Sequence, residues 1–333
     1  MIKVGIPAAL AYYQYYPMWK TFFETLGAET VTSPPTTRTS IIEGARRVVP
    51  DTCLPVKAFM GHVLYLTDKC DYLFVPIIRS IKKRAYNCAK FLGLPDMVRA
   101  VIPNCPPVID IEIDVNKGLP RLLEDIIKFS KIFTDNRQKI LEAINQAWKV
   151  QEEYLKLIAS NQFLPLEAFN VLFGEQGKTT QNILKSSTDK GITIAITGHH
   201  YLIYDEEINH HLLPRLQKAG CRVFTPEMLE PETLEKATAQ VTGKAYWTWE
   251  EEVIGAGKYY IDQKVDGVIG ISAFGCGPDS LMMELIRREA LRTNRIPFLN
   301  IVLEEHTAET GVITRLEAFL DMIERRKWRR KCE

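Results

Sequence analysis

The amino-terminal residues combine a short apolar run with a longer stretch of apolar residues at helical spacing. Residues 2–7 read IKVGIP, which is typical of a buried strand and the turn that follows it. Between residues 12 and 26, large apolar side chains recur three or four positions apart, namely Tyr16, Trp19, Phe22, Phe23 and Leu26. This period predicts an amphipathic helix, so a strand is followed by a helix.

The same alternation continues in the rest of the first part and again in the last part of the chain. In the first part the pattern predicts strands at residues 29–33, 72–77 and 108–115, and helices near 41–47, from 53 onward and at 91–102. In the last part it predicts strands at 191–198, 222–225, 268–274 and 298–303, and helices at 208–219, 246–261, 279–291 and 313–326. Strands that alternate with helices predict parallel sheets covered by helices on both faces. Ligands of such sheets bind beyond the carboxyl ends of the strands.

The middle of the chain has a different pattern. Residues 119–172 show long helical periods, and residues 174–190 are rich in Gly, Gln, Thr, Ser and Lys without a period, as linkers are. With 333 residues, the chain also exceeds the size at which one hydrophobic core stops growing. We therefore expect an α/β protein with an amino-terminal lobe at 1–117, a helical connection and linker at 118–189, and a carboxyl-terminal lobe at 190–333.

The net charge and the lack of targeting segments argue against several classes of function. The 42 basic and 41 acidic residues leave a formal charge of +1, which provides no overall field to attract nucleic acid or an acidic membrane. The first residues lack the basic and apolar regions of a signal peptide, and no apolar run is long enough to span a bilayer. We expect a cytoplasmic protein that binds neither nucleic acid nor membrane.

Seven cysteines in such a compartment call for an explanation other than disulfide bonds, because cytosolic thiols stay reduced. Cys53 stands at a predicted helix start, where unpaired backbone N–H groups favour a thiolate. Cys276 lies between two glycines after a predicted buried strand, and these glycines let a bulky ligand approach the backbone. Cys88 and Cys105 lie in the loops before and after the predicted helix at 91–102.

Thiolates suit zinc and iron-sulfur clusters, while a small buried hydrophobic residue is the alternative reading for each cysteine. No Cys-x-x-Cys pair occurs, so the spacing selects neither metal, and the fold would have to assemble a site from separate loops.

Two further groups follow predicted strands. His199 and His200 come after the strand at 191–198, where a histidine could protonate a substrate or simply cap the next helix. Glu305 and His306 come after the strand at 298–303, at the same pole as Cys276, and could act as an acid-base pair. We take His199, Glu305 and His306 as candidate catalytic residues.

Several motifs together resemble one family. They are PAAL at 7–10, YPMW at 16–19, CLPVK at 53–57 with Gly61-His62, CAKFLGLPD at 88–96, GHHY at 198–201, FGCGPDS at 274–280, Glu305-His306 and TRLEAF at 314–319. In these the chain resembles the acyl-CoA dehydratase activase-related proteins of anaerobes over nearly its whole length. It is more distantly similar to the 2-hydroxyacyl-CoA dehydratase subunits and the double-cubane-cluster proteins.

The resemblance implies two Rossmann-like lobes with an oxygen-sensitive iron-sulfur cluster at the cleft between them. A 4Fe-4S cluster is expected, and a larger double-cubane type is the alternative. The resemblance carries over Cys53, Cys88 and Cys276 as ligands, whereas Cys105 matches no cysteine expected in relatives and is a further metal-ligand candidate. Residues 88–90 read Cys-Ala-Lys where the family pattern has Cys-Pro-Lys, which affects the rigidity of the loop more than ligation.

The resemblance also implies a partner, a separate ATP-hydrolysing activase that supplies low-potential electrons. The chain has no glycine-rich phosphate loop of its own. One hypothesis is therefore a component that accepts these electrons and reduces or dehydrates a small substrate of unknown identity, with a homodimer as the expected assembly. The alternatives are an electron-transfer or cluster-scaffold protein that serves a partner enzyme, and a small-molecule binding protein with a structural zinc ion.

Overall fold

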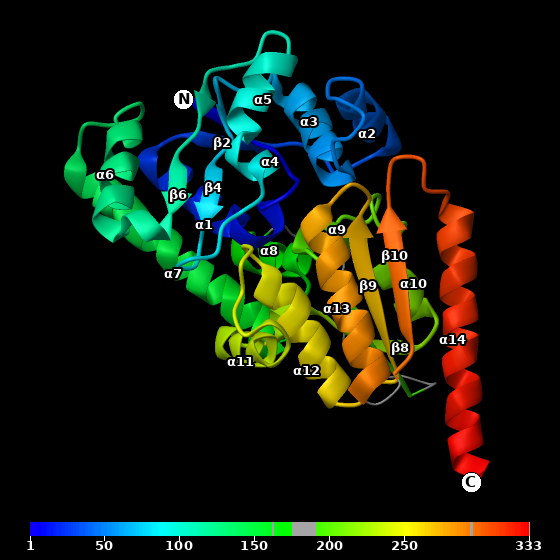
Figure 1. Ribbon diagram of the computed structural model, residues 1–333. Helices are drawn as coiled ribbons and strands as arrows, with labels where there is room; N and C mark the ends of the chain where they lie inside the picture. Colours follow the sequence, from blue (N-terminus) through cyan, green and yellow to red (C-terminus); the bar gives the residue numbers. More distant parts are fainter. Residues whose placement is uncertain (162, 175–190, 294–295, 333) are drawn as a thin grey trace. The chain divides into compact units, whose positions relative to one another are not determined.

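The computed structural model describes residues 1–161, 163–174, 191–293 and 296–332 (Figure 1). The predicted linker at 174–190 lies outside the described residues except for Gly174. The chain folds into two compact units, and most contacts between residues lie within one unit or the other. Met1–Leu157, α8 (Pro165–Phe173) and Tyr246–Thr248 belong to the first unit, whereas Ile158–Leu164 and the other described residues after 190 belong to the second.

The first unit is built on a four-stranded parallel sheet. Its strands run in the order β2-β1-β3-β5, with bounds β1 (Lys3–Ile6), β2 (Glu29–Thr32), β3 (Tyr72–Phe74) and β5 (Val108–Ile109). The predicted strand at 72–77 is divided, and β4 (Ile77–Ser80) pairs with β6 (Glu112–Asp114) in a separate parallel sheet. On either side of Pro76, the N–H groups of Val75 and Ile77 still bond to the carbonyls of Ile109 and Ile111.

Helices surround this sheet. They are α1 (Tyr12–Leu26), α2 (Arg38–Ala45), α3 (Leu54–Leu66), α4 (Ala89–Leu92), α5 (Leu94–Val101), α6 (Leu119–Ser130), α7 (Arg137–Asn161) and α8. The aromatic face of α1 is buried as its period predicts, and the ring of Phe23 meets that of Phe74 edge-on at 5.1 Å. Tyr154 of α7 donates its hydroxyl proton to the carbonyl of Tyr13, which attaches α7 to the start of α1.

Helices α2 and α3 pack at very short range. A Cβ atom at Gly44 would lie 1.9 Å from the carbonyl oxygen of Lys57, and one at Gly61 would lie 2.0 Å from that of Ser40. Only glycine allows this approach, so the two residues set the position of α3 and of its first turn.

The second unit repeats the strand order of the first. Its parallel sheet has the order β10-β9-β7-β8, with bounds β7 (Ile192–Thr197), β8 (Cys221–Phe224), β9 (Gly267–Ala273) and β10 (Phe298–Leu303). In both units the first strand of the sheet lies between the second and the third, and the fourth follows the third. The parallel sheets of both units confirm the predicted α/β fold.

The helices of the second unit are α9 (His200–Ile203), α10 (Leu212–Lys218), α11 (Pro231–Thr242), α12 (Ala256–Asp262), α13 (Gly277–Thr293) and α14 (Glu309–Cys332). A π-helical turn at Glu251–Gly255 precedes α12. Helix α13 packs on β9, and α14 packs beside β10 (Figure 1). Every residue of β9 is buried, as expected for a central strand of a sheet covered on both faces.

Several elements of this unit differ from the sequence-based expectation. The predicted helix at 246–261 is not helical over its first residues, because Trp249 has a left-handed φ of 65°, and the π-helical turn begins at Glu251. The predicted helix at 208–219 begins only at Leu212, because His210 and His211 both have left-handed φ angles, of 56° and 57°. Helix α11 was not predicted, although Pro231 at its first turn is a typical start signal.

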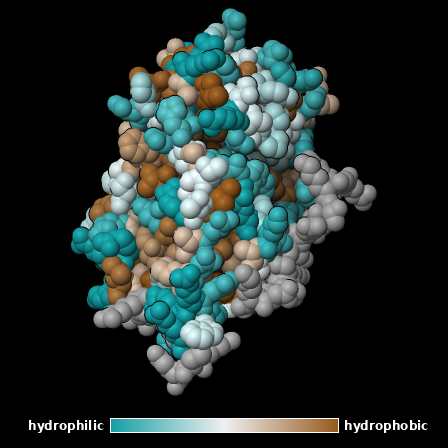
Figure 2. Space-filling view, turned by 90° about the vertical axis from the view of Figure 1, so that its right-hand side faces the viewer, coloured by the Kyte–Doolittle hydropathy of each residue, from teal (hydrophilic) through white to brown (hydrophobic). Residues whose placement is uncertain are grey.

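No helix among the described residues is both long and apolar enough to cross a membrane. On the face shown in Figure 2, hydrophobic residues lie in small groups among hydrophilic ones. Small groups of exposed apolar residues are normal on protein surfaces.

Candidate functional site

The carboxyl ends of β7 and β9 form the natural ligand position of the second unit. The connection after β7 leads to β8 on one side, and the connection after β9 leads to β10 on the other. Where successive connections diverge in this way, the loops separate and leave room for a ligand. His199 and His200 follow β7, and Gly275 and Cys276 follow β9.

His199 is joined across this position to the start of α13. Its Nε2 lies 2.8 Å from Oδ1 of Asp279, and both side chains are buried. Asp279 Oδ2 accepts the backbone N–H of Ala273 at 3.3 Å, so the carboxylate is fixed to the end of β9. Burial acts to lower the pKa of His199, but the carboxylates of Asp279 and then Glu252 outweigh burial and leave that pKa raised.

The alternative reading of His199, a helix cap, applies only to its backbone. His199 occupies the N-cap position of α9, and its carbonyl accepts the N–H groups of Leu202 and Ile203. Its side chain makes no capping hydrogen bond. The imidazole is directed instead to Asp279 and is stacked against the ring of Tyr201, with centroids 5.1 Å apart.

Cys276 stands one helical turn before Asp279. Its N–H bonds to the carbonyl of Ala273 at 3.1 Å, and its own carbonyl accepts the N–H of Ser280 at 3.1 Å. Gly275 has a φ of 77°, which permits the sharp turn between β9 and α13. The half-buried thiol of Cys276 is therefore at a helix N-terminus, beside backbone N–H groups without intrahelical partners.

Cys53 and Cys88 repeat this arrangement in the first unit. Cys53 is the N-cap residue of α3, and Cys88 is the N-cap residue of α4. The carbonyl of each accepts the first N–H groups of its helix, and both residues are half-buried. Because α3 runs back toward the amino end of β3, its first turn lies on the side of the carboxyl ends of the strands. Cys88 follows β4 and lies at the same pole.

Cys105 is located differently. It precedes β5, as Cys70 precedes β3, which puts both at the amino ends of the parallel strands. Burial raises the pKa of Cys70 to about 11, and burial also raises the pKa of Cys105. The thiol of Cys105 donates to the carbonyl of Pro106 at 3.3 Å. These surroundings favour a neutral thiol at this position.

Glu305 and His306 lie in the turn after β10, as expected. Glu305 is half-buried and His306 is exposed. The turn is closed by Thr307, whose hydroxyl accepts the N–H of Glu304 at 2.9 Å. These two candidate residues therefore have more contact with solvent than His199 has.

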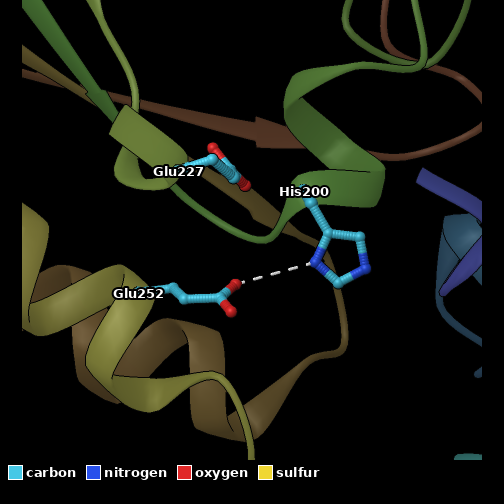
Figure 3. A group of neighbouring side chains, drawn as sticks. All are labelled: His200, Glu227 and Glu252. Carbon is cyan, nitrogen blue, oxygen red and sulfur yellow. Dashed lines mark ion pairs between the residues drawn. The ribbon is translucent and has the colours of Figure 1, made fainter. Parts of the chain in front are cut away.

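A group that the sequence did not predict surrounds His200. Glu227 and Glu252 each bring a carboxylate close to its imidazole (Figure 3). Glu227 comes shortly after the predicted strand at 222–225, so the position after a strand end was a usable signal. Glu252 stands in the π-helical turn, which helical periodicity does not reveal.

Comparison with protein families identifies the chain. A family model described as CoA enzyme activase uncharacterised domain (DUF2229) matches residues 3–229. The chain belongs to this family. The match confirms the predicted resemblance, and it includes Cys53, Cys88 and His199 but ends before Cys276. No curated protein matches the chain.

Proposed function

We propose that this member of the family is an iron-sulfur protein of the 2-hydroxyacyl-CoA dehydratase/activase type, with Cys53, Cys88 and Cys276 as cluster ligands. The observation that carries the proposal is the common setting of these three residues. Each is a half-buried cysteine whose carbonyl oxygen accepts an N–H group of the helix that follows. The family description, which names CoA enzyme activases, supports a role of the activase type.

The donor set fits such a cluster chemically. Thiolates are the usual ligands of iron-sulfur clusters, and backbone N–H groups at a helix N-terminus stabilise the negative charge on sulfur. Three cysteines would leave one iron atom of a cubane without a protein ligand. The cluster, when bound, would supply one-electron chemistry at low potential. The electron donor would be a separate ATP-hydrolysing activase, and the acceptor would be a small substrate that is reduced or dehydrated.

His199 would supply the proton chemistry. Its Nε2 faces Asp279, which fixes the orientation of the ring, and its Nδ1 accepts no hydrogen bond within the described part of the chain. A histidine held in this way by a carboxylate can exchange a proton with a substrate at its other nitrogen. The stacked ring of Tyr201 keeps the imidazole in place.

Anaerobic purification with iron and sulfide analysis tests the cluster. We expect a brown protein that loses its colour in air, and we expect Cys276→Ser to lose most of its iron. Cys70→Ser is the matched control, because serine can keep the hydrogen bond that the thiol donates to the Leu66 carbonyl at 3.2 Å. Equal iron content in these two variants would refute the assignment of Cys276.

Two further variants test whether Cys105 is a ligand and whether His199 is the acid-base group. Cys105→Ser shows whether that residue is a ligand, and from its surroundings we expect its iron content to be unchanged. His199→Gln should keep the iron but reduce turnover of an activase-coupled substrate by about 100-fold or more, which is the usual contribution of an acid-base group. Light scattering of the anaerobic protein tests the expected homodimer.

A further inference from the structure

Three separate segments of the second unit bring metal-ligating side chains together. His200 is the first residue of α9 after β7, Glu227 lies in a 3₁₀ turn (Pro226–Met228) after β8, and Glu252 lies in the π-helical turn. One ligand atom from each of the three lies within 4.8 Å of the others. Figure 3 shows both carboxylates on the side of the imidazole that bears one of its nitrogens.

The spacing of the three ligand atoms is close to that of ligands around an ion. The Nδ1 atom of His200 lies 3.8 Å from Oε2 of Glu252, which is too long for a hydrogen bond. Nitrogen and carboxylate ligands each lie about 2.0–2.2 Å from a bound zinc ion, so two of them stand at most about 4.4 Å apart. The three ligand atoms lie within 4.8 Å of one another, so a small movement of these side chains toward each other would let them bind one ion.

Burial gives a second, independent indication. His200 is fully buried, and the Glu252 side chain is only 21% exposed. The Oε1 atom of Glu227 is enclosed and accepts no hydrogen bond from the described residues, whereas its Oε2 accepts the hydroxyl of Tyr204. A buried carboxylate oxygen without a donor is costly, and a cation would satisfy it.

Charge and backbone geometry agree with this reading. Two acidic side chains, Glu227 and Glu252, are held at one position beside the His200 imidazole. Trp249, which is edge-on to His200 at 5.0 Å, has a left-handed φ of 65°. Together with the π-helical turn it directs Glu252 toward the imidazole, and π-helical turns are frequent at functional sites.

We propose that His200, Glu227 and Glu252 bind a divalent transition-metal ion of the Mn²⁺, Fe²⁺ or Zn²⁺ class. An imidazole ligand favours these ions over Mg²⁺ and Ca²⁺, which take oxygen ligands. The Tyr204 hydroxyl holds the Glu227 carboxylate from outside the shell, as second partners of metal ligands commonly do. The ion joins the segments that follow β7 and β8 to the π-helical turn, and it needs none of the cysteines.

Manganese is the best probe, because Mn²⁺ prefers oxygen and nitrogen ligands to the thiolates elsewhere in the chain. Chelator-treated full-length protein is titrated with Mn²⁺, and free Mn²⁺ is measured by electron paramagnetic resonance. We expect one ion per chain and a metal-dependent rise in the melting temperature, because binding to the folded state stabilises it. Glu252→Gln and Glu227→Gln should each weaken binding by about tenfold or more.

Two control variants make the result specific. Glu232→Gln changes an exposed carboxylate on α11 and should bind Mn²⁺ as the wild type does. Cys276→Ser should also keep Mn²⁺ binding even if its iron content falls, so this site and the proposed cluster are tested separately. The proposal is overturned if Cys276→Ser, which keeps His200, Glu227 and Glu252, binds neither Mn²⁺ nor Zn²⁺. Wild-type affinity in both glutamine variants also overturns it.

Discussion

Asp279 uses its two carboxylate oxygens to join residues on two different strands. Oδ1 faces Nε2 of His199 at 2.8 Å beyond the end of β7, and Oδ2 accepts the N–H of Ala273 at the end of β9. One side chain in the first turn of α13 therefore connects the candidate proton donor to the loop that carries Cys276.

Removal of this carboxylate should destabilise the second unit. Asp279→Ala leaves the buried His199 without its ion-pair partner and the N–H of Ala273 without its acceptor, and we expect a loss of about 3 kcal/mol in the free energy of unfolding. Urea denaturation followed by circular dichroism measures the loss. Asp321→Ala, an exposed carboxylate on α14, is the control and should change the free energy by less than about 0.5 kcal/mol. Similar values for the two variants would show that the pair contributes little.

His62 should make the first unit sensitive to acid. Ser33 Oγ lies 2.7 Å from Nδ1, Thr36 Oγ1 lies 2.9 Å from Nε2, and burial lowers the pKa of His62 to about 4. The unfolded chain binds the proton with a pKa near 6.5, so the stability is fully present above that pH and is lost as the pH falls toward 4.

The shift corresponds to about 3 kcal/mol at pH 4, at 1.36 kcal/mol for each pKa unit. Free energies of unfolding of the wild type and of His62→Gln, measured between pH 7 and pH 4, should converge by this amount as the pH falls. A constant difference between the two across that range would contradict the burial of a neutral imidazole.

Two glycine-to-alanine substitutions, one at the contact of α2 and α3 and one in α14, should have opposite effects on stability. Gly44→Ala places a Cβ atom 1.9 Å from the Lys57 carbonyl oxygen, and we expect a destabilisation of about 1–3 kcal/mol. Gly311→Ala, in the first turn of α14, meets no atom within 4 Å and should stabilise by about 0.5–1 kcal/mol. Thermal unfolding of both variants checks the signs, and a neutral Gly44→Ala would mean that the two helices separate readily.

The hydroxyl of Tyr154 should contribute a buried hydrogen bond. Tyr154→Phe removes its donation to the Tyr13 carbonyl, and a loss of about 1 kcal/mol is expected. Tyr65→Phe, at an exposed position, is the matched control and should be close to neutral. Chemical denaturation resolves this difference if both variants keep the slope of the wild type.

The sequence predicts well what depends on local pattern. Strands such as 191–198 and 268–274 are continuous apolar runs, and Cys53 and Cys276 stand beside recognisable helix starts, so the alternation and the positions of these cysteines follow from the chain itself.

Contacts between distant loops are not visible in the sequence. Nothing near His199 indicates that its partner is Asp279, because the pair depends on β7 and β9 being neighbours in the sheet. Glu252 depends on a π-helical turn and on a left-handed residue that is not glycine, and neither has a sequence signature. His211, in turn, looks helical from its neighbours but adopts a left-handed conformation.

His199 and His200 are consecutive residues whose side chains serve different partners. One imidazole faces Asp279 at the start of α13, and the other faces Glu252 in the π-helical turn. Insertion or deletion of a single residue between β7 and α9 would exchange these directions and disrupt both groups at once. In related sequences the length of this loop should therefore vary less than the identity of its residues.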